Sequence, residues 1–125
     1  MLLFEGKNKL GILLGIYVWP NSVDVGVYIP HSGSILINGN AKIGKNCILH
    51  GENCIGNIGY GDVAPILDDD IDLGVGAKVI GDVYLAKGIK VGANAVVLTS
   101  CYEENATLVG VPARVVSSKK CIKKG

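Results

Sequence analysis

The chain contains two histidines, His31 and His50, whose side chains are suited to exchanging protons near neutral pH. His31 lies in the stretch Ile29-Pro30-His31-Ser32-Gly33-Ser34-Ile35-Leu36, where the spacing of the aliphatic residues slips from six to eight. A bulge in a regular strand pattern often re-aims a side chain for function. The stretch therefore predicts a displayed catalytic histidine or, alternatively, a bulge histidine without a chemical role.

The other candidate chemical groups do not form a recognisable metal motif. The cysteines are Cys47, Cys54, Cys101 and Cys121. They include no Cys-x-x-Cys pair, so we expect free thiols, two of them filling the core. The densest acidic group consists of Asp68, Asp69, Asp70 and Asp72. It lacks the spacing of a calcium loop, and two histidines fall short of a three-histidine zinc site, so we expect solvated carboxylates and no metal.

The composition limits the class of protein. A chain of 125 residues with 49% hydrophobic residues forms one domain, and a net charge of +1 gives no footprint for nucleic acid or an anionic membrane. The apolar start, residues 1–16, is interrupted by Glu5, Lys7 and Lys9. It is too short and too charged to span a bilayer, and it lacks a signal-peptide cleavage site. These features predict a cytoplasmic protein.

Aliphatic residues recur at every sixth position over most of the chain. The first run is Ile37, Ile43, Leu49 and Ile55. The second run is Leu67, Leu73, Val79, Leu85, Val91 and Val97. The runs share one phase, which only Gly61 breaks, and a period of six suits a short strand followed by a corner. Three such units close a triangular coil of eighteen residues, which predicts an all-β fold, the single-stranded left-handed parallel β-helix.

The coil count places residues from different turns next to one another. Residues eighteen apart are expected to stack, so Ile55, Leu73 and Val91 would form one column. Two positions further on, Asn57, Val75 and Ala93 would then line one outer edge.

Upstream, two extra residues make Leu49 stack on Ile29, which places His50 one coil above Pro30 and close to His31. His50 is therefore a candidate acceptor-binding or second catalytic residue, or alternatively an exposed corner histidine.

The stretch from residue 15 to residue 116 resembles the catalytic domain of serine acetyltransferases and of the related acetyltransferases of surface-polysaccharide loci. The matching elements are Ile29-x-His31-x-Gly33-x-Ile35-x-Ile37, the segment 40–47, the repeat 76–81 and the ending Gly110-Val111-Pro112-Ala113-Arg114-Val115-Val116. The resemblance implies a short N-terminal segment over 1–15, a β-helical acetyltransferase domain over 16–116 and a basic C-terminal tail over 117–125.

This resemblance implies acetyl transfer from acetyl-CoA to the hydroxyl of a small molecule, L-serine or a sugar, in a homotrimer. His31 matches the general base of the family, which takes the hydroxyl proton as the oxygen attacks the thioester. The positions of Val75 and Ala93 offer backbone amides to the pantetheine arm, and Arg114 lies where a basic residue approaches the phosphates. An inactive trimeric β-helix scaffold is the alternative.

The sequence departs from the family near the base and at its ends. The carboxylate that orients the family's base maps to Tyr17, which we place with His50 among the substrate-binding residues, and Asp24 is a possible substitute carboxylate. The Arg-His pair that helps hold serine falls on Val63 and Ala64. The long helical N-terminal domain is missing, and the chain ends in Lys-Lys-Gly. Docking to cysteine synthase is therefore not expected.

Overall fold

The computed structural model describes residues 2–4, 16–17, 23–31, 33–59 and 61–116, with only the backbone of the first two segments. The described strands form three sheets. The first sheet contains β1 (Leu2–Phe4), β3 (Val27–Ile29), β6 (Ile48–Leu49), β9 (Asp72–Leu73), β12 (Lys90–Val91), β14 (Thr107–Val109) and β15 (Arg114–Val116), in that order. The second contains β13 (Val96–Val97), β10 (Lys78–Ile80), β7 (Asn53–Gly56), β4 (Ile35–Ile37) and β2 (Ile16–Tyr17). The third contains β11 (Tyr84–Leu85), β8 (Ile66–Leu67) and β5 (Lys42–Ile43).

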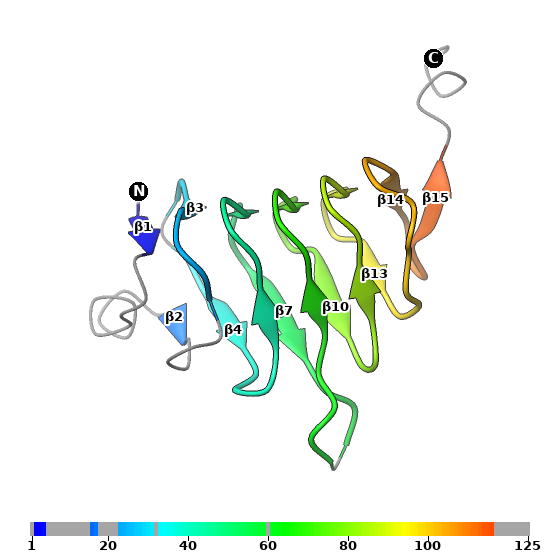
Figure 1. Cartoon of the computed structure of the whole chain (residues 1–125), viewed down its shortest axis with the longest axis horizontal. Coiled ribbons are helices and arrows are strands. Elements are labelled where there is room, and N and C mark those ends of the chain that lie inside the picture. Colours follow the sequence, from blue (N-terminus) through cyan, green and yellow to red (C-terminus); the bar gives the residue numbers. More distant parts are fainter. Residues whose placement is uncertain (1, 5–15, 18–22, 32, 60, 117–125) are drawn as a thin grey trace.

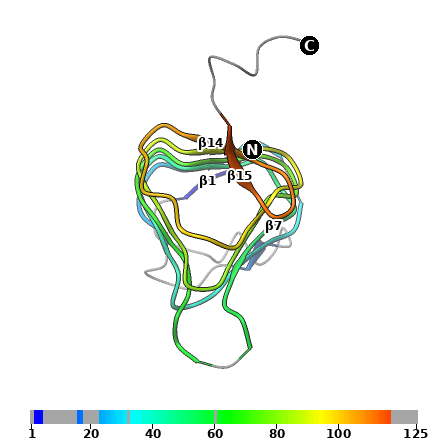
Figure 2. The same cartoon turned by 90° about the vertical axis from the view of Figure 1, so that its right-hand side faces the viewer.

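The three sheets are the three sides of a triangular prism. Successive coils stack along the long axis (Figure 1), and the view along that axis shows their triangular outline (Figure 2). The pairing is parallel throughout the stack, whereas β1 with β3 and β14 with β15 pair antiparallel at its two ends. The described residues confirm the predicted parallel β-helix.

The core consists of the aliphatic residues that the six-residue period predicted. Every member of the two runs, from Ile37 to Val97, is buried, because alternate residues of each short strand point inward. The residue two positions earlier is buried as well in each unit, for example Ala41, Cys47 and Ile71. Burial of one such Leu, Ile or Val side chain contributes about 1.5–3 kcal/mol, and stacking provides it to every coil.

The coil count was wrong at one point. Ile55 pairs with Val79, twenty-four positions later, while Leu73 pairs with Leu49 on one side and Val91 on the other. The predicted column of Ile55, Leu73 and Val91 therefore does not exist.

The reason is the segment 57–65 between β7 and β8, which leaves the prism as a protruding loop and adds residues to one coil (Figure 2). Asn57 belongs to this loop, where its side chain bonds to the Asn38 amide and the Gly61 carbonyl oxygen.

The described residues include no helix long and apolar enough to cross a membrane. Most of the N-terminal segment 1–15 and all of the basic tail 117–125, with Cys121, lie outside the described residues. The predictions made for them stay predictions. Of the remaining cysteines, Cys47 and Cys101 are buried, as expected for core residues, and Cys54 is half-buried, all as free thiols.

Candidate functional site

A groove of about 560 Å³ lies where the first sheet turns into the second. Its lining contains His31, His50, Gly51, Glu52, Gly74 and Val75. The pairing of Tyr28 with Ile48 places Pro30 beside His50, so the two histidines come from adjacent coils, as the sequence predicted. His31 is exposed, and the His50 side chain is 37% exposed. The structure thus brings three predicted site residues, the two histidines and Val75, into one groove.

His50 is held by a carboxylate. Its Nε2 lies 2.9 Å from Oδ1 of Asp72, which belongs to the next coil. Asp72 is opposite Ile48 in the ladder, so its side chain shares the outer face of the first sheet with the imidazole. A carboxylate accepts hydrogen bonds, so Nε2 donates and the neutral ring keeps its lone pair on Nδ1.

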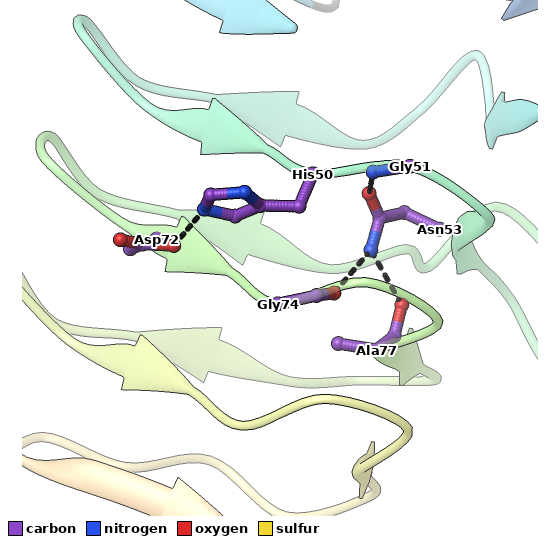
Figure 3. A network of polar contacts seen from close by, with 6 residues as sticks. All are labelled: His50, Gly51, Asn53, Asp72, Gly74 and Ala77. Carbon is purple, nitrogen blue, oxygen red and sulfur yellow. Dashed lines mark hydrogen bonds and ion pairs between the residues drawn. The ribbon is translucent and has the colours of Figure 1, made fainter. Parts of the chain in front are cut away.

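Asn53 ties together the two turns that form the floor of the groove (Figure 3). Its Oδ1 accepts from the Gly51 amide at 3.0 Å, and its Nδ2 donates to the carbonyl oxygens of Gly74 and Ala77, each at 3.0 Å. Asn53 is 3% exposed and occupies an inward position that the adjacent coils fill with the apolar residues Ile35 and Ala77. A buried amide with its hydrogen bonds made fixes the turn that carries His50.

The backbone at the groove is under local constraint. Glu52 has φ of 54°, in the left-handed region, where the other described non-glycine residues are all Asn or Asp. Its carboxylate approaches the Ser34 amide at 3.4 Å across the mouth of the bulge that carries His31. Gly74 is required by close approach, since a Cβ there would lie 2.8 Å from the Ala93 nitrogen.

A line of residues across the first sheet, called the track below, leads from the histidines to Arg114. Continuing the strand register, His50 is followed by Gly74, Gly92, Val109 and Arg114. The two glycines have no side chain on the track, and the Val109 side chain is 40% exposed there. Alongside it, Val75 accepts from the Asn94 amide, which places Ala93 next to Val75, as predicted. Ala93 and Arg114 do not line the groove itself but lie further along the same edge, and both are exposed.

His31 and His50 differ in what fixes the orientation of the ring. Among the described residues, no carboxylate makes an ion pair or hydrogen bond with His31. Asp24 does not take this place, because its Oδ1 accepts from the Val25 amide at 2.7 Å on another side of the prism. Tyr17 is described only by its backbone, beside Leu36 in the second sheet, so the role of its side chain stays a prediction.

The acidic group is more organised than expected. Asp68 accepts from the Tyr84 hydroxyl at 2.9 Å, Asp69 accepts from the Lys45 amide at 2.7 Å, and Asp72 holds His50. The hydrogen bond with Asp68 raises the pKa of Tyr84. These three residues are half-buried, so they combine these hydrogen bonds with contact to solvent. The described residues contain no group of His, Cys, Asp or Glu side chains placed to hold a metal ion.

The stacked hexapeptide coils, together with a groove that joins two histidines, are typical of the left-handed β-helical acyltransferases. A scan of protein-family models found none that matches the chain. The serine acetyltransferase of Synechococcus elongatus is 30% identical over 108 residues, 84% of this chain and 44% of that protein. The chain belongs to the serine acetyltransferase-like family of hexapeptide-repeat acetyltransferases.

Solved structures of serine acetyltransferases are also similar to the chain. A truncated serine acetyltransferase without ligand superposes with a TM-score of 0.77 at 28% identity, over 87% of this chain and 46% of that one. The Brucella abortus serine acetyltransferase in complex with coenzyme A gives 0.70 at 26% identity, over 82% and 39%. The chain thus spans less than half the length of these relatives, and the similarity includes the β-helix described above.

Proposed function

We propose that the chain is an acyltransferase that moves an acetyl group from acetyl-CoA to a hydroxyl of a small acceptor, L-serine or a sugar. The observation that carries this proposal is the groove in which His31 and His50 meet at the start of the track toward Arg114. Relatives named serine acetyltransferases, one of them solved with coenzyme A, support the reaction class.

His31 acts as the general base. Its neutral imidazole takes the proton of the acceptor hydroxyl while the oxygen attacks the thioester carbonyl carbon. The tetrahedral intermediate then collapses, the carbon–sulfur bond breaks, and the thiolate of coenzyme A takes up the proton from the imidazolium. The acetyl ester and free coenzyme A are the products, so atoms and charge balance.

The track holds acetyl-CoA with its thioester at the histidines. Within the described part of the chain, the amides of Val75 and Ala93 donate no hydrogen bond, so they are available to the carbonyls of the pantetheine arm. An amide pointed at the thioester oxygen stabilises the charge that develops there. The Arg114 guanidinium lies at the far end, where it pairs with phosphate.

The acetyl-CoA site is completed in a homotrimer. Exposed apolar side chains lie on and beside the second sheet: Leu36 of β4 and Leu98, which follows β13, are each about half exposed, and Ile58 of the protruding loop is 67% exposed. Exposed apolar side chains on one side of the prism favour burial against another subunit. A cytoplasmic location and the lack of docking to cysteine synthase remain predictions from the sequence.

An inactive scaffold is the second candidate, and the observation in its favour is that no described carboxylate orients His31. The deciding experiment measures coenzyme A release from acetyl-CoA with L-serine and a panel of sugars. Release that depends on an acceptor and is lost in His31→Ala supports the acetyltransferase. Absence of release with every acceptor, together with absence of coenzyme A binding, supports the scaffold.

A further inference from the structure

The groove contains a second imidazole that the base mechanism does not use. His50 lines the groove together with His31, and Asp72 fixes its ring through a 2.9 Å contact to Nε2. Figure 3 shows the other ring nitrogen on the side of the ring away from Asp72. Because Nε2 donates to the carboxylate, Nδ1 is the ring atom that can accept a hydrogen bond from a ligand.

Among the described residues, the Asp72 carboxylate makes its side-chain hydrogen bond with His50 alone. Its ladder neighbours on the outer face are Ile48 and Lys90, and no lysine or arginine ion pair engages its carboxylate. The contact also joins two coils, since His50 and Asp72 lie on neighbouring strands of the first sheet. A carboxylate that orients an imidazole in this way selects its tautomer and restricts its rotation.

The acidic side chains at the groove favour an acceptor molecule that donates hydrogen bonds. Glu52 lines it, Asp72 lies behind His50, and no lysine or arginine is among its described lining residues. A carboxylate on the acceptor would meet the acidic side chains of Glu52 and Asp72, while Lys90 lies beyond Asp72 on the next strand and does not line the groove. A hydroxyl or an ammonium group would instead find acceptors at Nδ1 of His50 and at the Glu52 carboxylate.

We propose that Asp72 is a positioning residue, which holds His50 so that Nδ1 binds a second hydrogen-bond donor of the acceptor beside the hydroxyl that His31 deprotonates. The inference rests on the proposed function and specifies its substrate: an acceptor with a hydroxyl and a neighbouring donor, either an ammonium or another hydroxyl. Adjacent coils lie about 4.8 Å apart, so two imidazoles on them reach two groups of one small molecule.

The kinetic test compares Asp72→Asn with the matched control Asp70→Asn, an exposed carboxylate of the same run. Acceptors are L-serine, ethanolamine, a methyl glucoside and 1-propanol, which has no carboxylate and no donor besides its reacting hydroxyl. We expect Asp72→Asn to raise KM for the donor-bearing acceptors about 3- to 10-fold, the effect of weakening one ordinary hydrogen bond. The KM for acetyl-CoA, and the kinetics of Asp70→Asn, should stay at wild-type values.

The acceptor panel also shows whether the second donor of the acceptor is an ammonium or a hydroxyl. A preference for ethanolamine assigns an ammonium, and a preference for the glucoside assigns a second hydroxyl. Equal use of 1-propanol, or kinetics of Asp72→Asn that match those of Asp70→Asn, would overturn the inference.

A second measurement does not depend on turnover. In protein labelled with ¹⁵N-histidine, His50 should carry its proton on Nε2, and ethanolamine or the glucoside should shift its Nδ1 resonance in wild type more than in Asp72→Asn. If no acceptor releases coenzyme A, the proposed function fails while this titration still decides the role of His50. An Nδ1-protonated His50 in the wild-type protein, or no Nδ1 shift with any acceptor, contradicts it.

Discussion

The Asn53 network allows a quantitative test of how the groove is held. In Asn53→Ala, the Gly51 amide loses its acceptor, and the carbonyl oxygens of Gly74 and Ala77 each lose one donor. The Gly74 oxygen keeps the bond from the Ala77 amide, so its loss is partial. An unsatisfied buried polar group costs about 1–3 kcal/mol, and we therefore expect the free energy of unfolding to fall by about 2–4 kcal/mol.

Asn53→Asp keeps the shape and separates hydrogen bonding from packing. One carboxylate oxygen still accepts from Gly51, but the other faces two carbonyl oxygens. Burial without a donor raises the pKa of the introduced carboxyl above its unfolded value near 4. A raised folded pKa means that stability is retained below the unfolded pKa and lost as pH rises through the folded pKa, so this variant should weaken from about pH 4 upward.

Urea unfolding followed by circular dichroism measures these changes. The control is Asn40→Ala, because Asn40 is exposed, lies outside the Asn53 network and donates to Asn38 Oδ1 through its backbone amide. The control should stay within about 0.5 kcal/mol of wild type. The reasoning is refuted if Asn53→Ala matches the control. It is equally refuted if Asn53→Asp is as stable at pH 7 as at pH 4.

Three further predictions concern the same coils. Glu52→Asn should raise the free energy of unfolding by about 1 kcal/mol, because Asn tolerates the left-handed backbone better, and equal or lower stability in urea would contradict this. Gly74→Ala should destabilise by about 1–3 kcal/mol, since its Cβ meets backbone of the next coil, while the control Gly56→Ala, which meets only Cys54 Sγ at 3.7 Å, should not. Burial raises the pKa of the Cys47 thiol to about 12. Above pH 9 this thiol therefore ionises only in the unfolded chain. Wild type should lose stability between pH 9 and 10 more steeply than Cys47→Ala, and parallel stability profiles of the two proteins would contradict the raised pKa of Cys47.

The fold could be predicted because its signal is local and repeated. Each six-residue unit must bury an aliphatic side chain at the same place, so aliphatic residues recur every six positions in the sequence. Leu67 to Val97 follow this period without exception. The meeting of His31 and His50 could be predicted for a related reason. The two extra residues between Ile29 and Ile37 are visible as a slip in the same period.

The partner of His50 could not be found in this way. The loop over residues 57–65 lengthens one coil to twenty-four residues, which is again a multiple of six, so the aliphatic phase is unchanged. The missing aliphatic at Gly61 is the one sign of the extra length, and it does not show that a whole unit leaves the prism. An eighteen-residue coil would put Asp68 beside His50, whereas the actual register puts Gly74 there and Asp72 within reach. Glu52 was missed because Glu is not a residue whose type indicates a left-handed backbone.

Both deviations from the eighteen-residue coil add an even number of residues, and this parity explains how the site was accommodated. Side chains alternate between the two faces of a strand, so an odd insertion would turn the following core residues outward, whereas an even one preserves their inward direction. The eight-residue unit keeps Ile29, Ile35 and Ile37 buried while it leaves His31 exposed on the surface. The protruding loop likewise keeps Ile55 and Leu67 buried, yet it advances the next coil by six residues and brings Asp72 to His50. The catalytic surface of a β-helix can therefore be changed by insertions at its corners while its core stays the same.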